Sequence, residues 1–277
     1  MVGARRFFTV NQIDATGVGS PHQKELEEYS ANKFSLFKGL EEATLHRIVY
    51  EDLGARFDDV GLNEDWTITI EFFPEANGHI SYFYYGDEFG DVEGELKFLF
   101  SGERVHMIPG EDTVTYTGII LDFIGRRIKN EEPSDKEYGE KTDLMKKILE
   151  QRKEPFNLLV EEDIDGLGKF IGGEVTKTGS KWRIKKRVFP EIFVEVTFDK
   201  DKNILDTSYS GKNLTKIGRY HIELIGTFTI NHILRYITIK NQDKELPSIC
   251  YKMFSRLFIK EQGWNHRKAC LLYTSPS

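Results

Sequence analysis

The first hundred residues change from a helical to a strand-like spacing of apolar positions. Ser20-Pro21-His22-Gln23 is typical of a helix start, because serine caps the first turn and proline fits its first position. Between residues 35 and 53 apolar side chains recur at helical spacing, and Gly54 stands where a helix-ending glycine is expected. Helices are therefore predicted within residues 21–54.

From Trp66 onward the apolar spacing is that of strands. Apolar and polar residues alternate strictly over 66–72, which predicts a half-buried strand. Asn77-Gly78 predicts a turn, followed by a return strand over 79–85 and a third strand over 95–100. The short links predict an antiparallel meander within 66–100, and helical spacing returns over 112–129.

A charged stretch over residues 131–142 separates this part from the second half. It holds few apolar residues and includes a proline and a glycine, so we interpret it as a linker. The predicted domains are residues 1–130 and 143–265. Each is expected to pack helices on a mainly antiparallel β-meander, which makes the fold class α+β with two small domains.

The second half is predicted to repeat the order of elements without a repeated sequence. A helix is expected over 143–153. The predicted strands are 169–177, 181–188, 191–198 and 219–228, and further helical patterns cover 231–236 and 247–262. The last residues, 266–277, resemble translated adapter sequence and are interpreted as a non-native tail that includes Cys270.

Composition and charge narrow the possible roles. A chain with 39% hydrophobic and 13% aromatic residues can form a packed core. The net charge of -7 argues against a general nucleic-acid coat or a basic membrane-surface protein. No apolar run approaches the roughly 18 residues of a membrane helix, and two cysteines cannot build a disulfide framework. We therefore expect a cytoplasmic protein with no membrane partner, and another protein is favoured over nucleic acid as its partner.

An acidic loop between the predicted strands is the first candidate site. The proposed ligands are Asp87, Asp91, Glu93 and Glu95. Their carboxylates would suit a divalent cation such as Mg²⁺. The function that the whole sequence favours, protein interaction, needs no cofactor. Glu95 with Lys97 also matches the Glu-x-Lys arrangement of metal-dependent nucleases, in which the lysine steadies the attacking water. The alternative is a solvated hairpin loop that keeps a sheet edge from aggregating.

A basic hairpin around Trp182 is the second candidate site. The proposed binding residues are Lys181, Arg183, Lys185 and Arg187. Strand alternation places them on one face, with Trp182 and Ile184 on the other. The basic face could dock phosphates or an acidic partner, or it could be the solvated face of an antiparallel sheet. Lys186 falls on the apolar side, which indicates a strand end or a sheet edge.

Other chemistry-bearing residues are scattered. None of the seven histidines forms a pair with metal-ligand spacing. His106, beside Arg104, is a possible general base because imidazole titrates near neutrality.

The second half resembles the ubiquitin-conjugating and RWD-type arrangement over about sixty residues. The resemblance rests on a helix followed by a meander whose strands meet at Phe189-Pro190. It implies a non-catalytic binding domain, because no cysteine lies in the stretch after the meander where a conjugating enzyme would need one.

These patterns favour a non-enzymatic protein-interaction or regulatory protein. No coherent catalytic set emerges, while an acidic loop and a basic hairpin lie in different halves. The two oppositely charged patches could also face each other as a domain contact. The alternative function is a metal-dependent hydrolase or nuclease that uses the acidic loop, residues 87–97.

Overall fold

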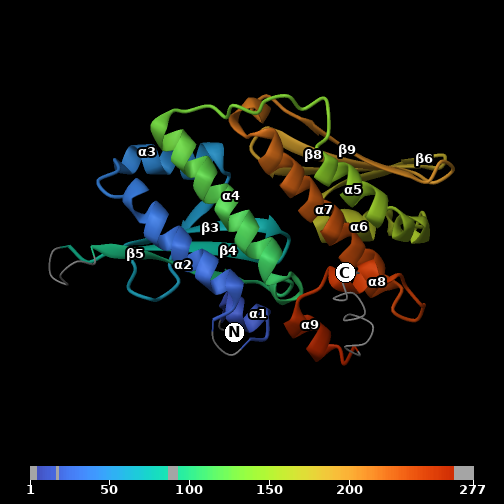
Figure 1. Cartoon of the computed structure of the whole chain (residues 1–277), viewed down its shortest axis with the longest axis horizontal. Helices are drawn as coiled ribbons and strands as arrows, with labels where there is room; N and C mark the ends of the chain where they lie inside the picture. The colour runs from blue at the N-terminus through green and yellow to red at the C-terminus, as the bar shows by residue number, and fades with distance from the viewer. Residues whose placement is uncertain (1–4, 17–18, 87–92, 265–277) are drawn as a thin grey trace, which may run out of the picture. The chain divides into compact units, whose positions relative to one another are not determined.

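The computed structural model describes residues 5–16, 19–86 and 93–264. The chain divides into two compact units, Met1–Glu132 (unit 1) and Pro133–Ser277 (unit 2), which Figure 1 shows in blue to green and in green to red. Within the described residues, α-helices accompany two antiparallel sheets of five and four strands, so the predicted α+β class is confirmed. No helix in these residues is long and apolar enough to cross a membrane. The tail 266–277 lies outside them.

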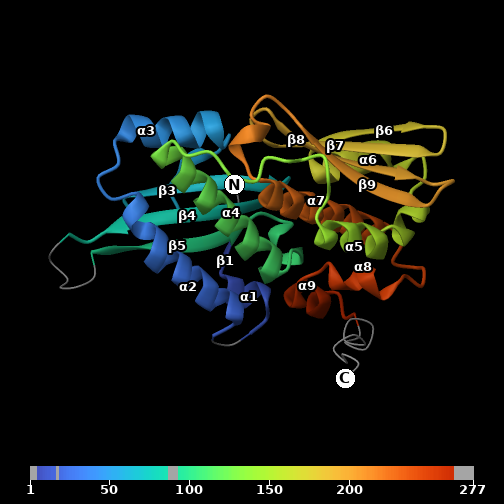
Figure 2. The same cartoon turned by 45° about the horizontal axis from the view of Figure 1, so that its top comes forward.

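Unit 1 is built on a five-stranded sheet of order β1-β5-β4-β3-β2. The strands are β1 (Phe7–Phe8), β2 (Arg56–Asp58), β3 (Trp66–Phe73), β4 (Ala76–Tyr84) and β5 (Gly94–Ser101). The helices are α1 (Val10–Ile13), α2 (Pro21–Lys33), α3 (Glu42–Arg47) and α4 (Gly110–Lys129), with a π-helical turn at Ile48–Asp52 and 3-10 turns at Phe34–Leu36 and Val105–Met107. Figures 1 and 2 both show α2 and α4 on one side of the sheet. The core lies there, where Phe72 of β3 stacks on Tyr116 of α4 with ring centroids 4.5 Å apart.

The predicted helices within 21–54 are present but interrupted. The side chain of Ser20 accepts a hydrogen bond from the N–H of Gln23, as expected for the cap of α2. The chain then leaves the helical path at Gly39, whose φ is +68°, and α3 begins only at Glu42. Gly54 ends this region with φ +64°, in agreement with the predicted role of that glycine.

The turn between β3 and β4 lies at Pro74-Glu75, so the prediction of a turn at Asn77-Gly78 was wrong. Phe73 pairs with Ala76, and Glu75 adopts φ +64°. Gly78 instead lies inside β4, because the ring of Phe72 fills the space of its missing side chain. A Cβ at Gly78 would lie 2.3 Å from Phe72 Cζ. The glycine therefore permits close packing of an aromatic ring on the strand.

Unit 2 is built on a four-stranded sheet of order β6-β7-β8-β9. The strands are β6 (Gly173–Thr178), β7 (Lys181–Phe189), β8 (Ile192–Asp199) and β9 (Ile204–Ser210). The helices are α5 (Asp143–Arg152), α6 (Asp163–Ile171), α7 (Arg219–Lys240), α8 (Ser248–Lys252) and α9 (Arg256–Glu261), with 3-10 turns at Glu154–Leu158 and Leu214–Lys216. Figure 2 shows α5 and α7 on one side of this sheet, and α6 packs on α7 through the stacked rings of Phe170 and His232.

Two of the elements predicted for unit 2 were wrong. Residues 219–228, predicted as a strand, belong to the 22-residue helix α7, and the fourth strand is β9. Helix α7 is buried on most sides, so its apolar residues form no one-sided stripe. Its threonines also favoured the prediction of a strand, because threonine is common in strands. In the helix the hydroxyls of Thr227 and Thr229 donate to carbonyls four residues earlier. The predicted strand 169–177 begins later, because α6 continues to Ile171.

The charged stretch that was interpreted as a linker is bound to unit 2 from Pro133 onward. The hydroxyl of Tyr138 donates to the carbonyls of Leu214 and Ile217, at 2.9 and 2.7 Å. The Asp135 carbonyl accepts from the N–H of Arg219, at the start of α7. The stretch thus differs from a free linker, because its polar groups hold the N-terminal end of a buried helix.

The two units share a repeat that sequence patterns did not reveal. Phe73-Pro74-Glu75 and Phe189-Pro190-Glu191 form the same two-residue turn, with Glu75 at φ +64° and Glu191 at φ +58°. A register shift precedes the turn in both sheets. Counting back from this turn makes Trp66 equivalent to Trp182.

The repeat continues beyond the meander. Gly102 and Gly211 follow the last strand of each sheet with φ +110° and +127°. The carbonyls of the two turn glutamates accept hydrogen bonds from the N–H groups of Arg104 and Asn213, at 2.9 and 3.2 Å. A 3-10 turn and a long helix follow in each unit, α4 or α7. The units are therefore two versions of one α+β arrangement.

Candidate functional site

The described part of the acidic loop is occupied by ion pairs and hydrogen bonds. A Glu93 carboxylate oxygen lies 2.6 Å from Lys38 Nζ. Glu95 accepts a hydrogen bond from the hydroxyl of Tyr85 at 2.6 Å and lies 3.0 Å from Lys97 Nζ. Asp87 and Asp91 lie outside the described residues. Among the side chains that are described, no group of three or more His, Cys, Asp or Glu could hold a metal ion, so the Mg²⁺ site stays a prediction.

The basic hairpin lies at the centre of the unit 2 sheet. Strand β7 pairs with β6 on one side and with β8 on the other, and Trp182 and Ile184 point into the core. Lys181, Arg183 and Arg187 are exposed, and Lys185 is half-buried, on the opposite face. The expectation that Lys186 marks an edge was wrong, because its buried ammonium donates to the carbonyl of Ile171 at 2.9 Å.

These cations lie on the side of the sheet that points away from α5 and α7. We call this side the outer face of unit 2. Its charged and hydroxyl members are Glu174, Thr176, Thr178, Lys181, Arg183, Lys185, Arg187, Glu195, Thr197, Asp199, Asp206, Ser208 and Ser210. Strand pairing aligns Thr176, Arg183, Thr197 and Asp206 in one row across all four strands. The face is therefore a continuous polar surface on a paired sheet.

Two acidic side chains of the outer face, Glu195 and Asp199, lie beneath cations. Arg183 Nε is 2.7 Å from a Glu195 carboxylate oxygen, and the Arg183 side chain is 64% exposed whereas that of Glu195 is 15% exposed. Lys181 and Lys202 each approach Asp199 to 3.9 Å, and both lysines are far more exposed than this aspartate. The cations therefore stand further out than Glu195 and Asp199. Asp206, by contrast, is 52% exposed and lies 2.7 Å from Lys141 Nζ.

A shallow hollow of about 560 Å³ lies over the same strands. It is lined by the row Thr176, Arg183, Thr197 and Asp206, together with Lys181 and Ile204 among others. Ile204 is 53% exposed, an unusual fraction for an apolar strand residue. The hollow has the volume of a binding pocket but is open, and charged and hydroxyl side chains stand beside apolar ones in its lining.

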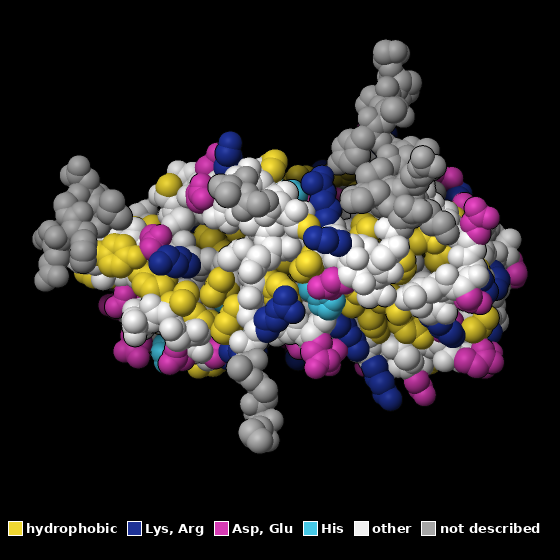
Figure 3. Space-filling view, turned by 90° about the horizontal axis from the view of Figure 1, so that it is seen from below, with side chains coloured by type: hydrophobic (Ala, Val, Ile, Leu, Met, Phe, Trp, Pro, Cys, Tyr) yellow, Lys and Arg dark blue, Asp and Glu magenta, His cyan; other side chains and the backbone are white. Residues whose placement is uncertain are grey.

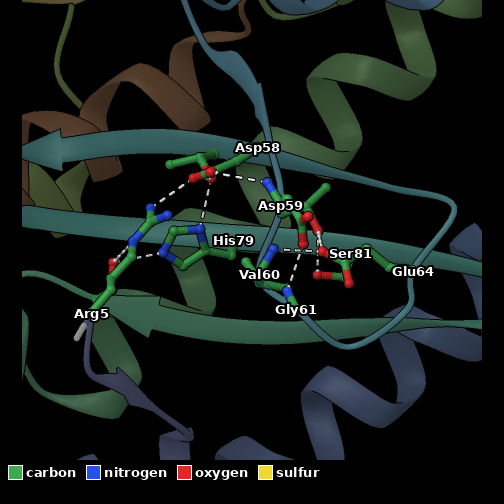
Figure 4. Close-up of polar contacts among 11 residues, drawn as sticks. Arg5, Asp58, Asp59, Val60, Gly61, Glu64, His79 and Ser81 are labelled. Atoms are coloured by element: carbon green, nitrogen blue, oxygen red, sulfur yellow. Dashed lines mark hydrogen bonds and ion pairs between the residues drawn. The ribbon is translucent and has the colours of Figure 1, made fainter.

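The equivalent face of unit 1 holds a buried hydrogen-bonded network, drawn in Figure 4. Thr69 Oγ1 lies 2.8 Å from Asp58 Oδ2 and 2.7 Å from His79 Nδ1. His79 Nε2 lies 2.7 Å from Ser101 Oγ, and the Nε of Arg5 reaches the same Ser101 oxygen at 3.4 Å. Thr69, His79 and Ser101 are at most 1% exposed.

The network is satisfied when His79 is neutral. Because the Asp58 carboxylate only accepts, the Thr69 hydroxyl donates to it and accepts from His79 Nδ1–H. The His79 Nε2 then accepts from the hydroxyl of Ser101. Burial, reinforced by the positive charge of Arg5, lowers the pKa of His79 from 6.5 to about 4. Every ring nitrogen of the neutral histidine thus has a partner of the right kind.

The connection between β2 and β3, residues 59–65, covers part of this face. The carboxylate of Glu64 accepts from the N–H groups of Val60 and Leu62 at 2.6 and 2.8 Å, and from the hydroxyl of Thr67 at 3.0 Å. Figure 4 shows the connection passing beside Ser81, which itself bonds to Thr67. Burial opposes ionisation of Glu64, but the backbone hydrogen bonds outweigh it and lower its pKa. We name residues 59–65 the covering connection.

Sequence analysis missed this network. Ser101 and His79 have the spacing of a nucleophile and its base, but both are almost fully buried, so a substrate would have no access to them. The signal in the sequence was the set of polar residues that alternate with apolar ones in two neighbouring strands, Thr67 and Thr69 in one and His79 and Ser81 in the other. His106, the histidine that was singled out, instead lies in a 3-10 turn beside Phe8.

Comparison with known proteins gives no relative. No family model, curated protein or solved structure matches the chain. The resemblance of the second half to ubiquitin-conjugating and RWD-type domains therefore stays a prediction. Function has to be argued from the geometry of the two sheet faces.

Proposed function

We propose that the chain is a non-enzymatic protein-interaction protein and that the outer face of unit 2 is its docking surface. The observation that carries the proposal is the outward placement of Lys181 and Arg183 at a hollow on the paired strands of the sheet. A surface on paired strands is held in place before binding, so little ordering is needed when a partner arrives.

The charge balance of the outer face supports a protein partner. Four basic residues, Lys181, Arg183, Lys185 and Arg187, stand beside four acidic ones, Glu174, Glu195, Asp199 and Asp206. A nucleic-acid site would need an excess of basic side chains along one surface. Charges of both signs are interspersed with apolar side chains on the side of the molecule drawn in Figure 3 as well. Such mixed surfaces favour polar recognition by another protein.

The exposed ends of the cationic side chains could bind a partner while the ion pairs within the face remain in place. The Arg183–Glu195 contact uses Nε, and a guanidinium carries five N–H donors. The exposed Ile204 at the end of β9 adds apolar area beside the charged row. Interfaces combine such apolar anchors with a polar rim.

Site-specific cross-linking would test the proposal. A photoreactive amino acid at Thr197, in the middle of the outer face, should form an adduct with a protein that mass spectrometry can identify. The same group at Lys212, an 86% exposed residue outside this face, is the matched control. The purified partner should then bind the wild-type chain and lose affinity when Arg183, Lys185 and Arg187 are changed to glutamate. No specific adduct at Thr197, or a partner that binds this variant as well as the wild type, would refute the proposal.

A further inference from the structure

We infer that the partner presents an acidic, turn-forming polypeptide segment to the outer face of unit 2. The inference rests on the proposed docking function and adds the chemistry of the partner. Its basis is the equivalent face of unit 1, which a segment of that kind already covers.

The two faces can be compared residue by residue from their shared turn. Six positions before Phe73 is Thr67, which pairs with Ser81, and six positions before Phe189 is Arg183, which pairs with Thr197. Thr69 pairs with His79, and Lys185 pairs with Glu195 in the same relation to the turn. Thr67 and Arg183 are therefore equivalent, and so are Thr69 and Lys185.

Both positions in unit 1 meet a carboxylate. Thr67 donates to Glu64 of the covering connection at 3.0 Å. Thr69 donates to Asp58, the residue that directly precedes the connection, at 2.8 Å. An acidic group of the covering connection thus binds the face at Thr67, and the last residue of β2 provides the carboxylate at Thr69. The backbone N–H groups of Val60 and Leu62 satisfy the rest of Glu64.

Unit 2 places stronger carboxylate donors at the same two positions. Arg183 carries a guanidinium and Lys185 an ammonium where unit 1 has threonine hydroxyls. A cationic donor adds charge attraction to its hydrogen bond with a carboxylate, which a neutral hydroxyl does not. The Lys185 ammonium lies 4.6 Å from the ring centroid of Phe193, which holds it over the sheet.

Among the residues that the structure describes, unit 2 has no connection of this kind between β6 and β7. Two residues, Gly179 and Ser180, join β6 to β7, whereas seven residues, 59–65, join β2 to β3. A two-residue turn cannot fold back over a sheet face. The hollow of about 560 Å³ lies over the Arg183 row, where the covering connection lies over the Thr67 row of unit 1. An acidic segment of a partner would fill this place.

Selection from a peptide library tests the chemistry of the partner. A displayed library of random twelve-residue peptides is selected on the full chain, with the double variant Arg183→Glu/Lys185→Glu used to remove peptides that bind elsewhere. Peptides that survive should be rich in aspartate and glutamate around a turn. Their affinity, measured by fluorescence anisotropy, should fall at least about tenfold in Arg183→Glu and should weaken as salt is raised.

Two control variants test whether the position and the shape of the cation matter for peptide binding. Lys212→Glu introduces the same charge change outside the face and should leave the affinity unchanged. Arg183→Lys keeps the charge but loses the planar fork, and it should weaken binding less than Arg183→Glu. Backbone amide shifts of Arg183 and Thr197 on peptide addition should locate the peptide.

The possible failures separate the inference from the proposed function. If face-dependent peptides are neutral or basic, the acidic segment is wrong while the docking surface stands. If inorganic phosphate or a single-stranded oligonucleotide competes better than acidic peptides, a protein segment is the wrong occupant. If no peptide depends on the face and no adduct forms at Thr197, both the inference and the docking function fail.

Discussion

Unit 1 and unit 2 have equivalent sheet faces, but this face is buried in unit 1 and exposed in unit 2. In unit 1 the side chains of Thr67, Thr69 and His79 are at most 1% exposed. Thr69 and His79 belong to one hydrogen-bonded network, and Thr67 bonds to Ser81 and Glu64. In unit 2 the equivalent Arg183 is 64% exposed, and its ion pair with Glu195 lies at the surface. The backbone pairing of the two sheets is nevertheless the same around the shared turn.

The two faces differ in the connection beside them and in their side chains, because the backbone pairing of the sheets is the same. Residues 59–65 cover the face of unit 1 and bring a carboxylate to it, so its polar groups bond within the chain. Gly179-Ser180 is too short to do so in unit 2, and charged side chains occupy the positions of the threonines. Buried polar groups stabilise only when paired, whereas exposed ion pairs contribute little. We therefore expect the first face to serve stability and the second to serve binding.

The largest expected effect is common to both units and concerns the glycine after each meander. A Cβ at Gly102 would lie 2.1 Å from the Glu75 carbonyl oxygen, and one at Gly211 would lie 2.0 Å from that of Glu191. Both glycines also have φ values above +100°. Gly102→Ala and Gly211→Ala should each lower the free energy of unfolding of their own unit by about 4 kcal/mol. Denaturant unfolding, followed by fluorine-labelled Trp66 and Trp182, would measure this.

Gly179→Ala is the matched control for these variants. Gly179 also has positive φ, +59°, but a Cβ there meets nothing within 4 Å. The substitution should cost only about 1 kcal/mol, from the left-handed backbone alone. Equal costs at Gly179 and Gly211 would show that the contact with the turn carbonyl is not what makes the repeat require glycine.

The second prediction is that unit 1 loses stability at a pH at which unit 2 does not. The pKa of His79 is lowered to about 4 in the folded state, so the unfolded state binds more protons between pH 6.5 and 4. Stability of unit 1 should be complete above pH 6.5 and fall by up to about 3 kcal/mol as the pH drops to 4. Unit 2 has Glu195 at the equivalent position and should lack this loss. Unfolding at a series of pH values, read from the same two tryptophans, would compare them.

The variant His79→Gln tests whether titration of His79 causes the loss of stability, because glutamine keeps a donor and an acceptor but does not titrate. The loss between pH 6.5 and 4 should disappear in this variant. Asp58 acts in a separate window: burial opposes its ionisation, but Arg5 and Thr69 lower its pKa from 3.8 to about 2. Its contribution is lost only as the pH falls from 3.8 to 2, so an unchanged slope above pH 4 in His79→Gln would contradict the prediction.

The smallest effect is expected from the equivalent pair Thr67 and Arg183. Thr67→Val would remove the partner of buried Ser81 and of Glu64, and should cost about 1 to 2 kcal/mol. Arg183→Val removes an exposed ion pair and should change stability by no more than about 0.5 kcal/mol. Thermal unfolding of the two variants would compare them. Similar costs would mean that the two faces contribute alike and that our distinction between them is wrong.

Local signals in the sequence predicted a good part of the fold. Ser20 predicted the start of α2, the alternation after Trp66 predicted β3, and the spacing around Trp182 placed the cations of β7 on one face. These features depend on neighbours a few positions apart. The α+β class follows from them because a change of period from helix to strand is visible along the chain.

The errors came from features that depend on distant residues. Asn77-Gly78 carries a turn signal, but packing of Phe72 requires a small residue there and the turn forms at Pro74-Glu75. Helix α7 is surrounded by other elements, so burial removed its helical periodicity. The polar network joins Arg5 to Ser101 across 96 positions, and no spacing rule predicts such a contact. The repeat is hidden because it is preserved at turns and glycines.

The hydrogen bonds of residues 133–142 also determine where unit 2 begins as a stable fragment. Asp135 binds the N–H groups of Arg219 and Tyr220 at the start of α7, and Thr142 binds Glu223 one turn later. A protease that cleaved after Lys141 would release a fragment without Asp135 and Tyr138. Such a fragment should be digested further from its long helix, whereas one that begins at Pro133 should resist digestion and retain the outer face of unit 2.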